Sequence, residues 1–526
     1  MDSDCGGDSD YDADADGHDS DDHSGDDCDD ADAAISPSAT ETWYDGVDSD
    51  CGGDSDYDAD ADGHDSDDHS GDDCDDAESA VSPSATEVCD NGIDDDCDGG
   101  AGTCRVTGSL TIPTDADVVL YGAGISSGPY YKGSGDHNGD GYTDIAIGDQ
   151  GPDDVYILEG PTTGRVDGRT SADVIIDGSG NFGVSLAWAG DMDNDGYDEL
   201  LVGADLHASQ SGSVFVAHGP LTSGTYTDHV AVSNTAYRGR MGVYPQTSGA
   251  GDVNGDGYDD MIIGQSFDSR RHGYAYLFLG PVTADVLVSA ADTTFSGANG
   301  TYGATNTAGA GDLDGDGYDD LIIGSAYASE GGGSAAGAAY IIFGPASADI
   351  ALTDADVVLA GQTNNSLSSW VTSPAGDTDG DGNIDIVMGS SDDTAWLFNG
   401  PFTTDRTTAG ADVEFTADVA DSWLGYMVSD AGDLDQDGFD DVVIGAWDYD
   451  DDGAAFVWYG PISGAQVSTD AELALNAVST GYGVGFSVQS VGDYNADGFP
   501  DLGVFSRSIE GSSTSGGMQV VFGGGM

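Results

Sequence analysis

Basic residues are scarce in this sequence. Of its 526 residues, 10 are Lys or Arg and 100 are Asp or Glu, which gives a formal net charge of −90 at pH 7. A chain with this charge repels the phosphate backbone, so nucleic-acid binding by ordinary electrostatics is excluded. The shortage of lysine argues equally against attachment to an anionic membrane surface.

Long apolar runs are also missing. No run approaches the roughly 18 apolar residues that a membrane-spanning helix needs. The first ten residues, MDSDCGGDSD, lack the basic and apolar parts of a signal peptide. We therefore expect no transmembrane segment, and no signal peptide within this chain.

Cysteine is absent from most of the chain. The seventh and last cysteine is Cys104, and none follows it. A cysteine-bearing acidic segment before a cysteine-free body predicts two domains, residues 1–104 and 105–526. It also favours an oxidising exterior over a cytosol. The odd count leaves one thiol unexplained.

The first hundred residues are a tandem repeat. Residues 2–31 recur without change at residues 48–77, and a shorter third copy begins at Asp94. Because Met1 stands where an upstream copy should continue, we expect a truncated or processed N-terminus. The segment has few apolar residues and no Lys or Arg. We expect it to be disordered or extended unless metal ions and disulfides organise it.

Alternating aspartates in this segment are candidate calcium ligands. Oxygen ligands at alternate positions, followed by a glycine, are typical of calcium loops. The alternative is a solvated acidic linker. The pattern occurs at Asp12, Asp14 and Asp16, and again at Asp58, Asp60 and Asp62. Four nearby histidines, His18, His23, His64 and His69, could instead select copper or zinc, although histidines in polar runs are more often exposed bystanders.

The stretch DDCDDAESAVSPSATEVCDNGIDDDCDG at residues 72–99, with DYDADADGHDSDD between such cores, carries a family resemblance. It resembles the metal-binding repeats of bacterial surface proteins, including the methanotroph copper-binding surface protein family. One position departs, because Trp43 stands where the second copy has Cys89. Any bond from Cys89 to Cys97 would have no counterpart at Cys51, which leaves the pairing in the first copy open.

A second repeat fills the body from about residue 106. Seven nine-residue loops, here called loops one to seven, place oxygen ligands at positions one, three, five and nine, and we expect a backbone carbonyl from position seven. Position twelve is apolar, as at Ile323, so these are not EF-hands and each loop joins strand to strand. The candidate ligands, loop by loop, are Asp136, Asn138, Asp140, Tyr142 and Asp144; Asp191, Asp193, Asp195, Tyr197 and Glu199; Asp252, Asn254, Asp256, Tyr258 and Asp260; Asp312, Asp314, Asp316, Tyr318 and Asp320; Asp377, Asp379, Asp381, Asn383 and Asp385; Asp433, Asp435, Asp437, Phe439 and Asp441; and Asp493, Asn495, Asp497, Phe499 and Asp501.

The loops differ in charge. Asn138, Asn254 and Asn495 each replace one carboxylate, and ligand charge affects calcium affinity, so we expect these three loops to bind Ca²⁺ more weakly. The ion is expected to be structural, because no histidine or basic residue recurs nearby and nothing suggests activated water. The alternative is that some loops are metal-free turns, which Asp, Asn and Gly also favour.

Short strands surround each loop. An apolar strand follows it, as in LIIG at 321–324, and then a second strand that ends in Gly, usually Gly-Pro, as in YIIFGP at 340–345. Two further strands complete most repeats, and four short strands repeated seven times are typical of a seven-bladed β-propeller. The body opens with the third type of strand, at 115–120, and ends with the second, at 519–523. We expect these termini to pair and close the ring, which removes exposed sheet edges.

Loop, apolar strand and a Phe-Gly pair such as Phe182-Gly183 recur in one order throughout the body. This combination resembles the FG-GAP repeats of the integrin α-subunit propeller. The resemblance implies calcium bound between the first and second strands of each blade, in a family that serves adhesion or recognition. Departures are local: Met241-Gly242 in the third repeat, Ser369-Trp370 in the fifth, and Pro500 in loop seven.

These observations predict an all-β, calcium-binding recognition or adhesion protein with an unknown protein or glycan ligand, and not an enzyme. Because calcium loops suit compartments where calcium is plentiful, we expect it to be secreted or on the outer surface of a bacterial cell.

Two alternatives remain open. A propeller-based hydrolase or lyase would need a convergent acid, base or nucleophile, because fold does not fix function. No repeat position is shared by four histidines of the body, His207, His218, His229 and His272. The basic cluster of Arg270, Arg271 and His272 is interpreted as a solvated loop. The alternative is that this cluster binds an acidic group. The other alternative is metal sequestration by residues 1–104.

Overall fold

The computed structural model describes residues 11–53, 55–85, 93–95, 97, 105–121, 130–132, 134–207, 212–225, 230–233, 247–265, 273–297, 303–304, 306–363, 371–478, 483–509 and 516–524. The chain divides into two compact units, Met1–Cys104 and Arg105–Met526, which are described separately. Several residues singled out above lie outside the described residues: Cys5, Cys89, Cys104, His229, Met241, Gly242, Arg270, Arg271, His272, Ser369 and Trp370.

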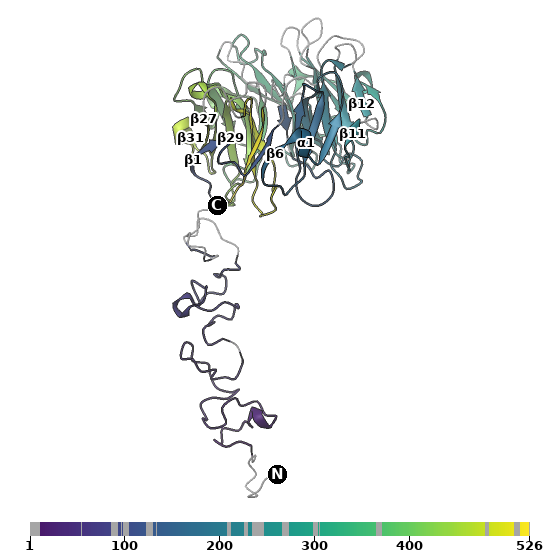
Figure 1. Cartoon of the computed structure of the whole chain (residues 1–526). Coiled ribbons are helices and arrows are strands. Elements are labelled where there is room, and N and C mark those ends of the chain that lie inside the picture. The colour runs from purple at the N-terminus through teal and green to yellow at the C-terminus, as the bar shows by residue number, and fades with distance from the viewer. Residues whose placement is uncertain are drawn as a thin grey trace. The chain divides into compact units, whose positions relative to one another are not determined.

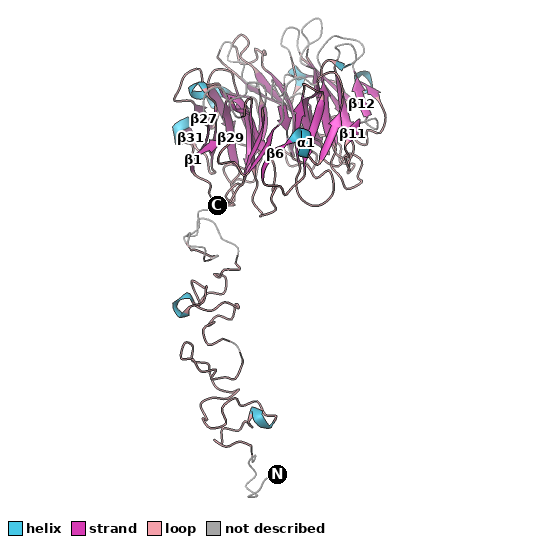
Figure 2. Cartoon of the chain, in the orientation of Figure 1, coloured by secondary structure: helices cyan, strands magenta, loops and turns pink. Residues whose placement is uncertain are grey.

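The first unit has little regular structure (Figure 2). Its described residues form turns and two short 3₁₀ helices, η1 (Asp21–His23) and η2 (Asp67–His69). Val81 is the single hydrophobic residue that these described residues bury. Burial of apolar surface therefore contributes little to the stability of this unit.

Two disulfides connect the turns of the first unit. Cys28 is bonded to Cys51 and Cys74 to Cys97, each across 23 residues. The two copies thus share one pairing, and Cys97 bonds Cys74 and not Cys89. Local geometry favours this choice, because the backbone N–H of Cys74 also donates to Cys97 Sγ at 3.0 Å. The substitution at Trp43 therefore leaves the first copy's disulfide intact.

The second unit is a seven-bladed β-propeller (Figure 1). Each blade is a sheet of short strands, and in six blades the loop joins two neighbouring strands of the same sheet. Loop one differs, because the strand before it, Tyr130–Lys132, pairs in parallel with Phe182–Trp188 of the second blade. In blade order, the sheets are β4 (Ile145–Asp149), β5 (Asp154–Leu158), β7 (Val174–Asp177) and β11 (Gly224–Thr225); β3 (Tyr130–Lys132), β8 (Phe182–Trp188), β9 (Leu200–Ala204), β10 (Ser213–Ala217), β12 (Val230–Ser233) and β16 (Val286–Leu287); β13 (Thr247–Gly251), β14 (Asp260–Gln265), β15 (Tyr274–Phe278), β17 (Thr293–Ser296) and β21 (Ile350–Ala351); β18 (Asn306–Gly311), β19 (Asp320–Ser325), β20 (Ala338–Ile342), β22 (Val357–Ala360) and β26 (Arg406–Thr407); β23 (Thr372–Gly376), β24 (Asp385–Gly389), β25 (Thr394–Phe398), β27 (Val413–Thr416) and β31 (Gly464–Val467); β28 (Leu424–Gly432), β29 (Asp441–Ala446), β30 (Ala454–Trp458), β32 (Leu473–Ala477) and β1 (Gly108–Ile112); and β33 (Val484–Ser490), β34 (Leu502–Ser506), β35 (Gly517–Val521), β2 (Val118–Tyr121) and β6 (Gly164–Asp167).

The helices of the second unit are single turns between strands. They are α1 (Gly168–Ser171), η3 (Val288–Ala290), η4 (Leu352–Asp354), η5 (Thr408–Gly410), η6 (Tyr449–Asp451) and η7 (Ser468–Asp470).

The blades are linked by an additional outer strand that the sequence pattern does not predict. After its second-type strand, each blade sends a short strand to the outer edge of the preceding blade, where it pairs in parallel, as β21 does with β17 and β26 with β22. Two strands before the first loop complete this scheme. β2 pairs antiparallel with β35 in the seventh blade, and β1 pairs in parallel with β32 in the sixth. The ring is thus closed in two neighbouring blades.

The apolar strands are buried on both faces. In β19, Leu321, Ile322 and Ile323 are all 0 % exposed, which explains a continuous apolar run in place of alternation. The glycine that ends such a strand marks a contact between blades. A Cβ placed on Gly148 would lie 2.0 Å from the carbonyl oxygen of Gly183 in the next blade. The glycine of Phe-Gly is therefore the other half of this contact.

Candidate metal centres

The backbone of loop four holds its aspartates in fixed orientations. Asp312 accepts hydrogen bonds from the backbone N–H groups of Gly315 at 2.7 Å, Asp316 at 3.0 Å and Gly317 at 2.9 Å. Asp314 Oδ1 accepts from the N–H of Asp316 at 3.1 Å, and Asp316 Oδ1 from that of Tyr318 at 3.0 Å. The backbone N–H groups thus hold the alternating aspartates in place before any ion binds.

All seven loops share this arrangement. The N–H of position six donates to the carboxylate of position one at 2.8 to 3.0 Å in every loop. The N–H of position seven donates to the carboxylate of position five at 2.9 to 3.2 Å. The departure at Pro500 leaves this pattern unchanged in loop seven.

Position nine has a second role that the sequence pattern does not reveal. Its carboxylate is 0 % exposed in every loop. In loop four, Asp320 accepts from the N–H of Leu313 at 2.7 Å and from the N–H of Gly344, in the Gly-Pro pair, at 2.7 Å. The same two bonds recur in the other six loops. Position nine therefore connects the loop to the end of the second-type strand of the same blade. The recurring Gly-Pro pair at that strand end is the sequence feature that could have predicted this contact.

Burial makes these carboxylates hard to ionise. It raises the pKa of Asp320 and Asp385 to about 6, of Asp144, Asp260 and Asp501 to about 7, and of Asp441 to about 8. Neighbouring carboxylates of the same loop raise it further, as Asp314 and Asp312 do for Asp320. A cation among these oxygens would reverse the effect, since opposite charge favours the ionised form. The four carboxylates are thus close enough to act on one ion, and the donor set fits one.

In three loops, an asparagine side chain forms a hydrogen bond with one of the carboxylates that would face the cation. Where position three is Asn, its side-chain NH₂ donates to the second oxygen of position five. The distances are 3.0 Å from Asn138 to Asp140, 3.0 Å from Asn254 to Asp256 and 2.7 Å from Asn495 to Asp497. An ion that binds in these loops must break this hydrogen bond, and it has one carboxylate ligand fewer.

Loop six contains a guanidinium group. Arg105 Nε bonds Asp435 Oδ2, and its Nη2 lies 2.7 Å from Asp437 Oδ2. The same guanidinium lies over the ring of Tyr459, 5.3 Å from its centre. Positions three and five of this loop, counted above as free ligands, are therefore engaged by a residue outside the repeat. Charge count alone does not describe loop six.

Aspartates at position eight connect neighbouring loops. Each accepts a hydrogen bond from the N–H of position one in the preceding blade, at 2.7 to 2.9 Å, and each returns one from its own N–H to the carbonyl of that residue. These residues are Asp198, Asp259, Asp319 and Asp440. The first ligand of a loop is thus positioned in part by the next blade.

The first unit builds a related centre from different elements. Ligand oxygens of Asp58, Asp60 and Asp62 lie within 4.8 Å of one another, and those of Asp12, Asp14 and Asp16 do the same. A further carboxylate joins each cluster from 11 residues beyond the third aspartate: Asp27 and Asp73 are 0 % exposed and interact electrostatically with them. The second oxygen of Asp27 and of Asp73 has no hydrogen-bond partner among the described residues. Asp27 and Asp73 occupy the same position in the two identical copies of the repeat, which is the sequence feature that could have identified them.

A third type of cluster was missed because its spacing is irregular. Glu41, Asp48 and Asp50 bring one oxygen each to within 4.8 Å. The loop backbone holds them, since Glu41 accepts from the N–H of Asp50 at 3.0 Å and Asp48 from that of Gly53 at 3.1 Å.

The histidines of the first unit are engaged by neighbouring side chains. His18 and His64 each lie 3.2 Å from an aspartate, Asp26 and Asp72. The ring of His23 stacks on Tyr11 at 4.7 Å, and that of His69 lies between Tyr44 and Tyr57, at 4.8 and 5.2 Å. These contacts favour oxygen ligands over imidazole in this unit.

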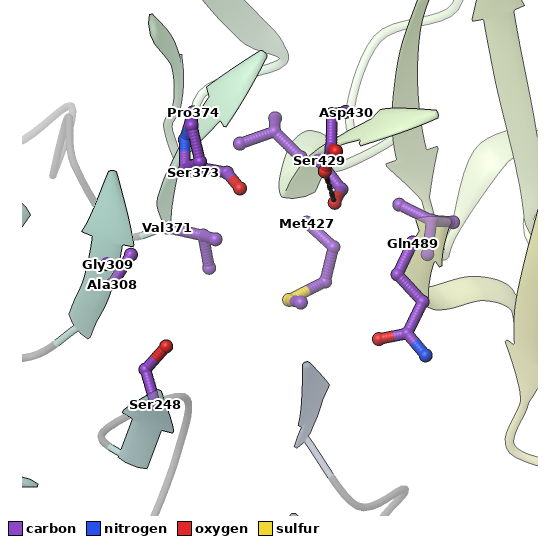
Figure 3. Close-up of a pocket in the computed structure, with 12 residues that line it drawn as sticks. Ser248, Ala308, Gly309, Val371, Ser373, Pro374, Met427, Ser429, Asp430 and Gln489 are labelled. Carbon is purple, nitrogen blue, oxygen red and sulfur yellow. Dashed lines mark hydrogen bonds between the residues drawn. The ribbon is translucent and has the colours of Figure 1, made fainter. Parts of the chain in front are cut away.

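The inner strands of five blades line a pocket of about 190 Å³ (Figure 3). Gln489 points into it, and both polar atoms of its side-chain amide are buried without a hydrogen-bond partner among the described residues. Among the described lining residues, Asp430 is the single ionisable one, and Ser429 donates to it at 3.0 Å. Hydrolysis by an acid–base pair would need a second such group, so these residues give the enzymatic alternative no support. No helix within the described residues has the length and apolar character needed to span a membrane.

Comparison with known families matches both repeat systems. The FG-GAP repeat matches residues 182–216, 244–278 and 304–342. A family described as "Putative metal-binding motif", Cu-binding MopE, matches residues 27–57 and 73–101. The first of these stretches contains the cluster of Glu41, Asp48 and Asp50.

Integrin α subunits are among the similar proteins. Integrin alpha-PS2 of Drosophila melanogaster is 32 % identical over 224 residues, which cover 38 % of this chain and 15 % of that protein. Integrin alpha-5 of Xenopus laevis is 31 % identical over 162 residues, covering 27 % and 14 %. The chain therefore spans a small part of these relatives. A crystal structure of BBS1N in complex with ARL6DN, soaked with lead, covers 76 % of this chain and 94 % of that chain at 12 % identity, but its TM-score of 0.43 is too low to bear on function. The chain thus folds as a seven-bladed β-propeller that contains stretches matching the FG-GAP repeat, is similar over part of its length to integrin α subunits, and carries MopE-like metal-binding motifs before the propeller in the sequence.

Proposed function

We propose that this protein is a secreted or cell-surface recognition or adhesion protein whose propeller is stiffened by calcium in its loops. The observation that carries the proposal is the buried carboxylate at position nine. In loop four, for example, it accepts from the N–H of position two and from the N–H of the glycine that follows the neighbouring strand. Burial raises its pKa, and a cation close by would favour its ionised form. Oxygen donors in flexible loops suit Ca²⁺, which takes six to eight such ligands.

The similar proteins and the lining of the pocket favour recognition over catalysis. The chain matches the FG-GAP repeat and is similar to integrin α subunits, and the pocket lined by the inner strands has a single ionisable group among its described lining residues. We therefore expect a protein or glycan ligand on an exposed face of the propeller, with the ions acting as braces. The two disulfides of the first unit and the demand for calcium both suit an extracellular setting.

Metal analysis joined to thermal unfolding tests this function. The full chain is expected to copurify with several Ca²⁺ ions and to lose much of its melting temperature in chelator, with recovery when Ca²⁺ is restored. Loss of calcium with an unchanged melting temperature would refute the bracing role. Screening the calcium-loaded chain against glycans and surface proteins then tests recognition, and turnover of a screened polymer in place of binding would favour the enzymatic alternative.

A further inference from the structure

Loop two differs from the other six in two residues that lie in one cluster with Asp193. Position nine is Glu199, where every other loop has Asp. The residue before Gly-Pro, which follows the neighbouring strand β10, is His218, and the described counterparts in the other blades are Glu159, Leu279, Phe343, Asn399, Tyr459 and Phe522. Loop two is therefore the one loop in which the residue before Gly-Pro is a histidine. In loop one an imidazole comes instead from position two, where His137 Nε2 lies 3.7 Å from Asp144 Oδ2 and 3.4 Å from Glu159 Oε1.

The three side chains converge. His218 Nδ1 lies 3.5 Å from Asp193 Oδ2 and 3.6 Å from Glu199 Oε1. One ligand atom from each residue lies within 4.8 Å of the others. Asp193 Oδ1 is buried and has no hydrogen-bond partner among the described residues. The distances are long for hydrogen bonds and leave an oxygen unsatisfied, as expected where a cation would complete the group.

Each donor is held in place by a different part of the blade. Glu199 accepts from the N–H groups of Met192 at 2.7 Å and Gly219 at 3.3 Å. His218 forms a hydrogen bond with the backbone of Val282, from the next blade. A backbone partner of this kind orients the ring of a metal-binding histidine. The set is thus ordered before an ion arrives.

From these contacts we infer that loop two is a mixed nitrogen and oxygen site that selects a divalent transition ion, such as Mn²⁺, Co²⁺ or Zn²⁺, over Ca²⁺. Calcium takes oxygen ligands, whereas imidazole suits first-row transition ions. This inference rests on the proposal that the propeller loops hold divalent cations, and it makes loop two the exception among them. The competing explanation is an ion pair between a protonated His218 and the two carboxylates.

Electron paramagnetic resonance separates the two explanations. The full chain is loaded with Mn²⁺ in an excess of Ca²⁺, and spin-echo modulation from directly bound ¹⁴N is measured. We expect one nitrogen-coordinated Mn²⁺ per chain that is lost in His218→Gln, with Mn²⁺ affinity weakened by about tenfold or more. His207→Gln is the matched control, because His207 Nδ1 bonds the Ser213 hydroxyl at 2.9 Å and not a loop carboxylate.

Three outcomes are distinguishable. Nitrogen modulation that is equal in the wild type and in His218→Gln, or absent from both while Ca²⁺ still fills the ring, overturns this inference alone. Absence of all bound divalent ions overturns it together with the proposed function. Equal melting temperatures of the two variants in chelator exclude misfolding as the cause of a lost signal.

Discussion

One sequence pattern, three alternating aspartates before a glycine, is used in two settings in this molecule. In both, the glycine N–H donates to the first aspartate, at 2.9 Å from Gly317 to Asp312 in the propeller and at 3.1 Å from Gly63 to Asp58 in the first unit. The settings differ in the fourth carboxylate. Asp320 has a backbone N–H for each oxygen, whereas one oxygen of Asp73 is buried without a hydrogen-bond partner among the described residues.

This difference implies a different dependence on metal. A buried carboxylate oxygen without a partner is costly, so we expect an ion to complete the centres of the first unit. The propeller loops are anchored to strands whose apolar residues are buried, and they can keep their shape without one. Calcium is therefore expected to organise the first unit and to stiffen the second.

Chelation should separate the two units most strongly. We expect residues 55–85 to lose protection from hydrogen exchange when the full chain is treated with chelator, because Val81 is the single buried hydrophobic residue of the described first unit. Amides of β19 and β29 should remain protected. Exchange followed by mass spectrometry measures both in one sample. Equal loss of protection in the two units would remove the distinction.

The response of the metal-free propeller to pH should be the next largest effect, since it sums over all seven loops. The position-nine pKa is raised from 3.8 in the unfolded chain to between about 6 and 8 in six loops. The folded state thus binds more protons, so stability is greatest below about pH 4 and falls as pH rises toward 8. Calcium should invert this trend, because protons compete with the ion.

Melting curves of the full chain in chelator and in Ca²⁺, from pH 4 to 8, test the inversion. The first unit adds mostly shifts in the same direction, since burial raises the pKa of Asp14, Asp60 and Asp73, whereas the N–H of His18 lowers that of Asp16. A melting temperature in chelator that rises with pH would contradict the anchoring of position nine.

A pair of substitutions in loop four tests the anchoring at one residue. Asp320→Asn places an NH₂ group against one of two backbone N–H donors, so we expect a loss of about 1–3 kcal/mol of unfolding free energy even in chelator. Asp316→Asn is the control, because Asp316 is exposed and Asn can still accept from the N–H of Tyr318. Both should weaken calcium binding. Denaturant unfolding in chelator should show a change within about 0.5 kcal/mol for the control.

The sequence predicted the propeller correctly because each of its signals is local and repeated. A loop, an apolar strand and a Gly-Pro pair lie within some 35 residues of one another, as in residues 312–345. The outer strands β21, β26 and β31 escaped notice because they are short and half exposed, so no apolar pattern marks them. Their partners lie in the preceding blade, which periodicity within one repeat does not reveal.

The candidate ligands were predicted from spacing, but their hydrogen-bond partners were not. Asp73 follows Asp62 at an interval that no calcium-loop pattern contains, and the anchoring of Asp320 depends on Gly344, 24 residues away. Arg105 is the extreme case, since 330 residues separate it from Asp435. The Arg105 contact arises from the closure of the ring and the other two from folding within a repeat, and the spacing of ligands along the chain predicts none of them.

Arg105 offers the finest test of how loops differ. Its guanidinium bonds positions three and five of loop six, and an ion there must first displace it. We expect loop six to bind calcium more weakly than loop four despite its four carboxylates, and Arg105→Gln to raise that affinity severalfold. Arg165→Gln is the matched control, because Arg165 stacks on Tyr121 at 5.4 Å. Calorimetric titration that finds loop six unaffected by Arg105→Gln would show that the guanidinium and the ion bind side by side, and charge count would again order the seven loops.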